Sequence, residues 1–367
     1  MKITDIRTVP FVLPYEKPFE MATGVITEAA HVLIAVDTDD GVTGYAEAVS
    51  RPMIYGESQR SIVSAIEEWF RPALVGSDPL QIEAAQKALR AVAANETTKG
   101  ALDIALHDIM AKSLGMPVWR LLGASSPSLR ITRMLSMGSP EEVAAEAEDA
   151  ASSLGVSSFK IKVDADVELG SRVVHAVRRA VGEEATIYVD ANQSLAAETA
   201  IRFARMVEDA RLTYFEEPVP ATDFSGRSRL AGSTSVPILV DESSRTVEEA
   251  GLQFVHGSAR AVSIKTARTG YTESRRILGL VRGLHGRAVI GSQGDSAIGA
   301  ITSASLGAAD SMTSGEPAEL DYFLGLTDQI VTEPPSIRDG RMEINQTVPG
   351  TGVDIDADKL AFYRNDR

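Results

Sequence analysis

The chain has 367 residues, a formal net charge of −15, 44% hydrophobic residues and no cysteine. Its length suggests about two domains, and its acidic balance argues against nucleic acid as a partner, because nucleic acid needs a basic face. Without cysteine, disulfides, thiolate nucleophiles and thiolate metal sites are excluded. No apolar run is long enough to cross a membrane, and the first six residues alternate like a strand and carry an acid, so they do not resemble a signal peptide. We therefore expect a cytoplasmic enzyme.

The first part of the chain, to about residue 123, predicts a mixed α+β domain. Strand patterns come first and helical periodicity follows, an order typical of an α+β unit. The expected strands cover residues 3–13, 31–36 and 42–48, and the expected helices cover residues 61–74, 82–94 and 98–114. Residues 17–24 and 51–56 are predicted to be irregular segments with exposed apolar side chains.

Beyond residue 129, short β-branched runs alternate with helical stretches. The key residues at the strand ends recur roughly every 24 to 28 residues, about one strand plus one helix and two short loops. A closed parallel barrel is the common architecture that brings such strand ends to one point, so we predict an α/β barrel of seven or eight strands, with the active site at its C-terminal rim. The expected strands cover residues 130–135, 159–163, 187–190, 214–217, 239–242, 262–265 and 288–291, with a poorer candidate at 311–314. The segment from about residue 330 leaves this rhythm and is predicted to pack back on the first domain.

Two lysines stand near the end of the second predicted barrel strand. Side chains alternate along a strand, so Lys160 and Lys162 should point the same way. Their neighbours Ile161 and Val163 should face the helices. Inside a barrel, two ammonium groups so close are expected to lower each other's pKa, which would suit one of them to acid or base chemistry near neutral pH. The alternative is a pair of surface lysines on an edge strand.

Three acidic residues, Asp190, Glu216 and Asp241, each end a different predicted strand. Carboxylates that converge without a cation repel each other, and ligands that are all oxygen suit a hard divalent ion. We therefore predict a site for Mg²⁺ or Mn²⁺, supported by Asn192 from the loop after the third strand. The alternative is that each acid caps the helix that follows it.

Lys265 ends the sixth predicted strand, across the barrel from Lys162. A metal-bound group would then lie between two amines, which suits the transfer of a proton next to a carboxylate. Carbon acids of this kind ionise only when a cation stabilises the enolate. The alternative is that Lys265 is a charge partner for a nearby acid. By strand alternation, Glu217 and Glu242 should point away from the acids that precede them.

Several other kinds of site lack their sequence signals. The chain has no phosphate-binding Walker loop, no Gly-x-Ser-x-Gly nucleophile elbow and no dinucleotide-binding glycine pattern after a strand. None of the five histidines stands at the C-terminal end of a predicted barrel strand. We therefore expect the histidines to have packing or surface roles.

Over nearly its whole length the chain resembles the enolase superfamily, and within it the muconate-lactonizing subgroup. The motifs that carry the resemblance are Lys160-Ile161-Lys162, Asp190-Ala191-Asn192, Glu216-Glu217-Pro218, Asp241-Glu242-Ser243 and Lys265. The resemblance implies a (β/α)₇β modified TIM barrel over residues 124–328, an α+β capping domain over residues 1–123 and a C-terminal segment, 329–367, that packs on the cap. It also implies that the three strand-end acids bind Mg²⁺ or Mn²⁺, that Lys162 and Lys265 flank the substrate, and that the chain forms a homo-oligomer.

Within this subgroup, we hypothesise that the chain converts cis,cis-muconate to muconolactone, a reaction of aromatic catabolism. One substrate carboxylate would bind the metal, and the distal carboxylate would add to the conjugated double bond. Lys162 would then protonate the metal-stabilised enolate, with Lys265 as an electrostatic partner and Lys160 completing the catalytic group. A relative of the mandelate racemase type would instead need a histidine after the seventh strand, where residues 291–296 contain none.

The resemblance extends to residues expected to shape the substrate pocket. Met21 and Tyr55, in the two irregular segments, should close it, and Arg51 should bind the distal carboxylate. Two departures from the subgroup pattern could reshape the pocket: Gly270-Tyr271 replaces the usual Gly-Gly, and Asp295 replaces a common glutamate. The remaining residues expected to contact or support the substrate are Asn192, Gln293, Asp295 and Glu319.

The reaction has alternatives on the same scaffold. A dipeptide epimerase or N-acylamino acid racemase, related to o-succinylbenzoate synthases, would use Lys162 and Lys265 as two bases. Such epimerases usually carry Asp-x-Asp near the last strand to hold an ammonium group, which Glu319-Leu320-Asp321 only approximates. A sugar-acid dehydratase would need the missing histidine. From another class, the chain could be a binding protein that kept the barrel without catalysis.

Overall fold

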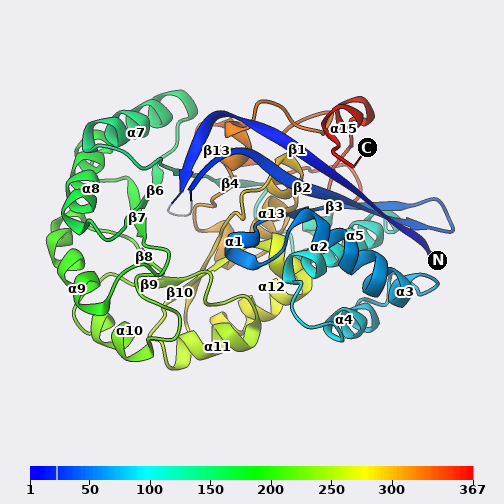
Figure 1. Cartoon of the computed structure of the whole chain (residues 1–367), viewed down its shortest axis with the longest axis horizontal. Coiled ribbons are helices and arrows are strands. Elements are labelled where there is room, and N and C mark those ends of the chain that lie inside the picture. The colour runs from blue at the N-terminus through cyan, green and yellow to red at the C-terminus, as the bar shows by residue number, and fades with distance from the viewer. Residues whose placement is uncertain (22–23, 367) are drawn as a thin grey trace.

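The computed structural model describes residues 1–21 and 24–366, which form a cap and a curled parallel sheet ringed by helices (Figure 1). The cap sheet is antiparallel, in the order β1-β2-β3. Its strands are β1 (Ile3–Met21), β2 (Gly24–Thr38) and β3 (Thr43–Val49). The first two strands are longer than predicted, and residues 17–21, expected to be irregular, continue β1. The reason is a register shift between Pro14 and Phe19, after which backbone pairing with β2 resumes.

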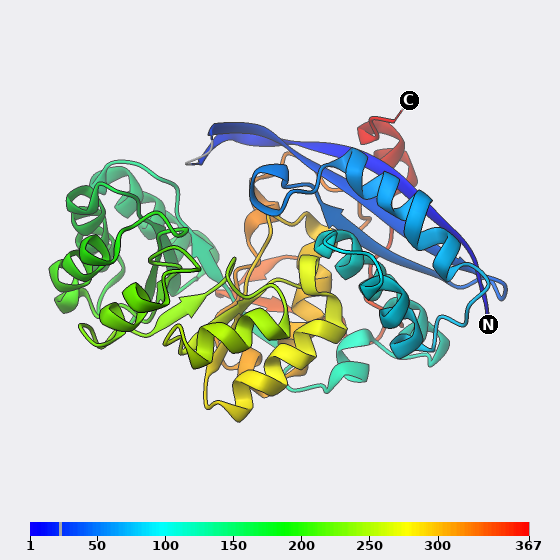
Figure 2. The same ribbon diagram turned by 60° about the horizontal axis from the view of Figure 1, so that its bottom comes forward.

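Helices complete the cap on one face of this sheet. The predicted helix over residues 61–74 consists of α2, a π-helical turn and α3, and the second predicted irregular segment contains the one-turn helix α1. Helix α5, buried on nearly all sides, lies between the cap strands and α12 of the barrel (Figure 2). The cap helices are α1 (Pro52–Tyr55), α2 (Gln59–Ala65), η1 (Ile66–Phe70), α3 (Arg71–Leu74), α4 (Ile82–Arg90), α5 (Glu96–Ser113) and α6 (Val118–Leu122).

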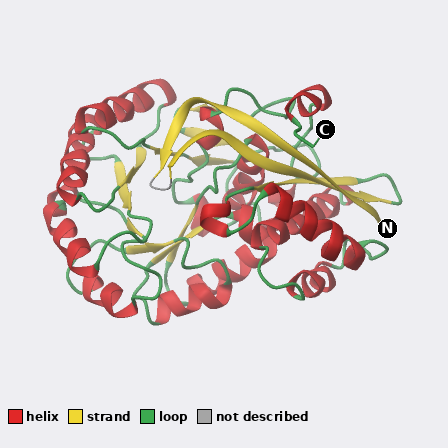
Figure 3. Ribbon diagram, in the orientation of Figure 1, coloured by secondary structure: helices red, strands yellow, loops and turns green. Residues whose placement is uncertain are grey.

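The second sheet has seven parallel strands that follow one another in chain order. They are β5 (Thr132–Met134), β6 (Ser158–Lys162), β7 (Thr186–Asp190), β8 (Phe215–Glu216), β9 (Ile238–Val240), β10 (Ala261–Ile264) and β11 (Arg287–Ile290). Figure 3 shows helices on the outside of these strands. The helices are α7 (Pro140–Leu154), α8 (Val167–Val181), α9 (Ala197–Met206), η2 (Glu208–Ala210), α10 (Phe224–Ala231), α11 (Val247–Val255), α12 (Thr266–Gly283) and α13 (Ala297–Ala309).

Backbone hydrogen bonds of Ala318 and Glu319 close this sheet into a barrel. Ala318 exchanges bonds of 2.8 Å with Arg130 and Thr132 on one side, and Glu319 N donates to Ile290 O over 2.8 Å on the other. The predicted α/β barrel with a cap is therefore confirmed. The candidate strand at 311–314 was wrong: these residues form helix α14 (Ser311–Ser314), whose first turn is capped by Asp310.

The C-terminal part of the chain returns to the cap and to the start of the barrel. Strand β13 pairs with β4, and Thr351 N donates to the buried carboxylate of Asp108 in α5 over 2.7 Å. The elements here are β4 (Ser128–Arg130), η3 (Tyr322–Gly325), β12 (Ile337–Arg338), β13 (Arg341–Glu343) and α15 (Ala357–Tyr363). The domain boundaries at residues 123 and 328 stay a prediction. In the described part of the chain, no helix combines the length and the apolar character needed to span a bilayer.

Candidate active site

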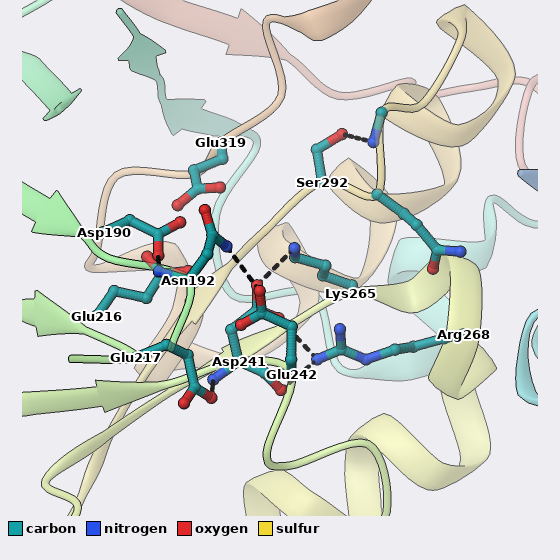
Figure 4. A network of polar contacts seen from close by, with 12 residues as sticks. Asp190, Asn192, Glu216, Glu217, Asp241, Glu242, Lys265, Arg268, Ser292 and Glu319 are labelled. Carbon is teal, nitrogen blue, oxygen red and sulfur yellow. Dashed lines mark hydrogen bonds and ion pairs between the residues drawn. The ribbon is translucent and has the colours of Figure 1, made fainter. Parts of the chain in front are cut away.

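The barrel interior is built in layers, and the candidate site is its top layer. Tyr188, Tyr214 and Leu239 form part of a buried apolar cluster inside the barrel. The acids Asp190, Glu216 and Asp241 follow each of these by two residues. Since side chains two apart on a strand share a face, the apolar layer is the floor and the acids stand above it. Figure 4 shows the acids and their polar contacts.

Lys160 lies at the centre of this acidic layer. Its ammonium group is buried and lies 2.8 Å from Glu216, 3.0 Å from Glu319 and 3.1 Å from Asp190. Burial opposes the charged form, but these carboxylates outweigh it and raise the pKa of Lys160 well above its ordinary value. The expected lowering of the pKa by the neighbouring lysine is therefore wrong for Lys160, because acids and not Lys162 are its nearest charges.

Lys162 is the more exposed lysine of the pair and borders the pocket. Its Nζ donates to Asp190 Oδ2 over 2.6 Å and to Asn192 Oδ1 over 2.8 Å. Asn192 in turn donates to Glu242 over 2.6 Å. Burial alone would raise the pKa of Asp190, but the positive charges of Lys160 and Lys162 outweigh it and lower that pKa. Burial and the charge of Asp190 raise the pKa of Glu216.

Lys265 stands on the opposite side of the pocket. Its ammonium group lies 2.5 Å from Asp241 Oδ2 and 3.5 Å from the hydroxyl of Tyr55. Arg268, one helical turn later, donates to the other oxygen of Asp241 and to its carbonyl, both over 2.8 Å (Figure 4). Burial opposes the charge of Lys265, but Asp241 outweighs it and raises the pKa of the lysine.

The two glutamates expected to point away from the site behave differently. Glu217 does point away and pairs with the buried Arg227. Glu242 lines the pocket instead, so its predicted orientation is wrong. The reason is that β9 ends at Val240, and strand alternation no longer governs the residues that follow. Burial, together with Asp241 and Asp190, raises the pKa of Glu242 to about 7.

The strand-end acids fit a hard divalent ion by their chemistry. Among the described residues, no three acidic or histidine side chains are already arranged around a common point, because lysine and arginine groups lie between them. However, Glu242 Oε2 is buried without a hydrogen-bond or ion-pair partner in the described part of the chain, and Glu216 Oε2 and Asp241 Oδ2 are buried beside one lysine ammonium group each. Buried carboxylate oxygens with free lone pairs are the ligands that Mg²⁺ and Mn²⁺ prefer.

A cavity of about 390 Å³ lies above these residues, between the cap and the barrel rim. Most residues predicted to contact substrate border it, including Arg51, Tyr55, Gln293 and Glu319. Asp295 does not: it lies behind the wall, where its carboxylate accepts a bond from Ser292. The side chain of Met21 lies outside the described residues. The lining residues are Arg51, Met53, Ile54, Tyr55, Met134, Leu135, Ser136, Met137, Lys162, Asn192, Gln193, Glu242, Lys265, Ser292, Gln293, Gly294, Glu319, Asp321 and Tyr322.

Arg51 brings to the pocket wall a positive charge that no carboxylate of the described residues pairs with. Its guanidinium is held by the carbonyl of Gln293 at 3.1 Å and the hydroxyl of Tyr322 at 2.9 Å. It also lies against Gly294, where a Cβ would clash with it. Within the described ranges, no carboxylate comes within ion-pair distance of Arg51. A buried guanidinium without an anionic partner is suited to bind an anion from the pocket.

Sequence reasoning missed two residues that organise the site. Arg268 stands three positions after Lys265, a spacing that could have signalled a shared helical face. Tyr188 stands two before Asp190, and its hydroxyl bonds to Glu319. The predicted effect of Gly270-Tyr271 on the pocket has no structural support, because Tyr271 is buried away from it and donates to Thr302 O.

Two family patterns together match most of the chain. The pattern "Mandelate racemase / muconate lactonizing enzyme, N-terminal domain" matches residues 3–123, and the pattern "Enolase C-terminal domain-like" matches residues 142–359. The second pattern extends to residue 359, beyond the predicted end of the barrel at residue 328, so the predicted domain boundaries stay a prediction.

The similar solved structures and curated relatives include muconate lactonizing enzymes, dipeptide epimerases and an N-succinyl-Arg/Lys racemase. A muconate lactonizing enzyme from Mucobacterium Smegmatis, complexed with muconolactone, is 40% identical and covers 100% of both chains, with a TM-score of 0.97. A dipeptide epimerase from Enterococcus faecalis V583, complexed with Mg and the dipeptide L-Leu-L-Tyr, is 26% identical over 96% of this chain and 100% of that chain, with a TM-score of 0.91. The L-Ala-D/L-Glu epimerase of Bacillus subtilis is 32% identical, covering 74% of this chain and 75% of its own length.

Proposed function

This chain belongs to the enolase superfamily, in the family of mandelate racemase and muconate lactonizing enzymes, and we propose that it converts cis,cis-muconate to muconolactone. Its similarity to cycloisomerases, epimerases and racemases makes it an isomerase of the muconate-lactonizing subgroup. The choice among these reactions depends on the charges around the pocket.

The observation that carries the proposal is the position of Arg51 relative to the acids. In an eight-membered ring of strands, β7 and β8, which carry Asp190 and Glu216, are opposite β11 and the closing segment 318–319. Arg51 is bound to residues that follow those two, Gln293 and Tyr322. A linear dicarboxylate that reaches from the acids to Arg51 would therefore cross the barrel mouth.

The two lysines lie on the other diagonal of the mouth. Lys162 ends β6 and Lys265 follows β10, and these are also opposite strands of the ring. A carbon next to the substrate carboxylate held at the acids would then have an amine on each side. This arrangement suits a reaction in which a proton is delivered to that carbon.

In the proposed reaction, an oxygen of the distal carboxylate forms a bond to C4 of the conjugated chain. The electron pair of the adjacent double bond moves toward the proximal carboxylate, giving an enolate. Lys162 donates its proton to the α-carbon and becomes a neutral amine, which regains a proton from solvent. Lys265 remains an ammonium group and stabilises negative charge on the opposite face. Arg51 holds the distal group in position for ring closure.

The residues that would hold a divalent cation are Asp190, Glu216 and Asp241, with Asn192 beside them. When bound, Mg²⁺ or Mn²⁺ would supply the positive charge that stabilises the enolate. A Mg ion is present in the structure of the related dipeptide epimerase. Binding would require the acids to exchange their present contacts with Lys162 and Lys265 for contacts with the ion.

A dipeptide epimerase is the second candidate, since its relatives are also similar in sequence. It would need acids near the last strand that are available to an ammonium group. Here Glu319 is bound by Lys160 and Tyr188, and Asp321 is paired with Arg133 at 3.0 Å. These contacts favour the dicarboxylate substrate, whose charges match Arg51.

A turnover screen tests the proposal. Purified protein with Mg²⁺ or Mn²⁺ is offered cis,cis-muconate, dipeptides and N-acyl amino acids, and loss of muconate absorbance is followed beside deuterium exchange at the amino acid α-carbon. Muconate turnover supports the proposal. Exchange into a dipeptide or an N-acyl amino acid with no response to muconate would replace it with the epimerase or racemase.

A further inference from the structure

The buried side chain of Arg268 contacts the cap on one side and a strand-end acid of the barrel on the other. Its guanidinium faces Tyr55, the last residue of the one-turn helix α1, and donates to the Tyr55 hydroxyl over 2.9 Å. The carbon at the centre of the guanidinium also lies 5.4 Å from the centre of the tyrosine ring, within the range of a cation–π contact. Through Tyr55, residues 51–56, here termed the cap loop, are connected to the barrel.

The backbone that carries Arg268 is fixed by the cap as well. Helix α12 is interrupted at Gly270, which has a φ of 57°, and the amides of Tyr271 and Thr272 donate to Asp103 of α5. Helix α5 comes so close that a Cβ at Gly100 would lie 2.9 Å from the carbonyl carbon of Arg268. The short turn after Lys265 therefore has little freedom to move independently of the cap.

The other end of the Arg268 guanidinium holds Asp241. Its Nη2 donates to Asp241 Oδ1 and to the backbone carbonyl of Asp241, each over 2.8 Å. The ammonium group of Lys265 lies 2.5 Å from the other carboxylate oxygen, Asp241 Oδ2. Arg268 is 2% exposed, so the bonds are not weakened by competing water. A displacement of Tyr55 would leave a buried donor without a partner and shift the group that orients Asp241.

We propose that Arg268 is a positioning residue that couples the placement of the cap loop, through Tyr55, to the orientation of Asp241. This inference depends on the proposed function in that Asp241 is taken as a metal ligand. A cap loop in place would orient Asp241 to receive the cation, and a bound cation would in turn hold the cap loop. Substrate binding under the cap would then be linked to metal binding in the barrel.

A double-mutant cycle tests this coupling. Tyr55→Phe keeps the ring and removes the hydroxyl. Arg268→Lys keeps the positive charge but replaces the guanidinium by a single ammonium group. The third variant combines both substitutions. Tyr45→Phe is the matched control: it is a cap tyrosine with its own cation–π contact, to Lys112, away from the pocket. Thermal unfolding identifies any variant that has lost its fold.

The first measurement is the affinity for Mg²⁺ by calorimetry without substrate. Each single variant should weaken binding about fivefold, and the double variant should be no weaker than Arg268→Lys, because both changes break the same connection. Unchanged affinity in Tyr55→Phe, or losses that multiply in the double variant, would overturn the coupling. So would a wild-type protein that binds no Mg²⁺.

The second measurement needs neither metal nor substrate. Hydrogen–deuterium exchange of the peptide spanning the cap loop should be about tenfold faster in Tyr55→Phe and Arg268→Lys than in the wild type or Tyr45→Phe. Equal exchange in all four proteins would also overturn the inference. A protein that shows the coupling but does not turn over muconate would disprove only the proposed function.

Discussion

Lys162 Nζ donates a hydrogen bond of 2.6 Å to Asp190 Oδ2, so the candidate proton donor is in direct contact with a candidate metal ligand. A cation bound at Asp190 would compete for the carboxylate and would leave the ammonium group of Lys162 nearer to the substrate. The proposed proton transfer by Lys162 and the proposed metal binding by Asp190 therefore depend on the same oxygen, Asp190 Oδ2.

The first prediction is that Lys162→Ala abolishes muconate turnover, with a loss of at least about 1,000-fold in kcat, because a positioned general acid contributes roughly 10² to 10⁴. The fold and the affinity for Mg²⁺ should remain. Lys87→Ala, an exposed lysine of α4, is the control and should behave as the wild type. Turnover close to normal in Lys162→Ala would remove the proposed mechanism.

Arg51 should determine the binding of the distal carboxylate. Hydrogen bonds to charged groups contribute about 1.5–3 kcal/mol, so Arg51→Met should lower kcat/KM for muconate roughly 10- to 100-fold. Arg172→Met, on the exposed side of α8, should have no effect. Steady-state kinetics decide between the two outcomes, and an unchanged kcat/KM would mean that another group binds the distal end.

Lys160 should be a stability residue when no metal is bound. Replacing it with methionine leaves Asp190, Glu216 and Glu319 without their shared cation, and breaking a buried ion pair costs about 3–5 kcal/mol. Urea unfolding of Lys160→Met should show this loss without divalent metal and a smaller loss with saturating Mg²⁺. Equal losses under both conditions would indicate that Mg²⁺ does not bind at these acids.

A pH effect on stability is expected from the buried Glu47 of β3. Burial first, and then the charge of Asp295, raises its pKa from 4.5 to about 8 in the folded protein. The folded state therefore binds more protons than the unfolded state between these values, and stability falls as pH rises through that range. The neighbouring His31 acts in the opposite sense, because burial lowers its pKa from 6.5 to about 3. Above pH 6.5 the effect of His31 has ended, and the effect of Glu47 adds to those of Glu216 and Glu242, whose pKa values burial also raises.

The resulting prediction is that Glu47 by itself contributes a loss of about 2 kcal/mol in the free energy of unfolding between pH 6.5 and 8. Glu47→Gln should abolish most of it, because an amide does not ionise and can keep the contacts to Ser296 and Gly299. Urea titrations at the two pH values provide the comparison. A variant that loses as much stability as the wild type would show that other groups titrate.

The barrel and the position of its strand-end residues were accessible from the sequence, because a two-residue period fixes the face on which each side chain lies. Asp190, Glu216 and Asp241 come together for that reason. Glu242 was misplaced because its strand ends two residues earlier, at Val240. The closing segment at Ala318 is too short to produce a pattern.

The contact between Tyr55 and Arg268 was inaccessible for a different reason. It joins residues 213 positions apart and depends on how the cap sits on the barrel. No local periodicity records such an arrangement. The same holds for the carboxylates around Lys160, one of which, Glu319, comes from 159 positions away.

The bond between Asp108 and Thr351 has a consequence for synthesis on the ribosome. Asp108 lies in the helix at the centre of the cap, yet one of its partners follows 243 residues later. A nascent chain must therefore leave this contact unmade while the whole barrel is being translated, which takes many seconds at ordinary elongation rates. This contact of the cap can form only after the C-terminal segment that carries Thr351 has left the ribosome.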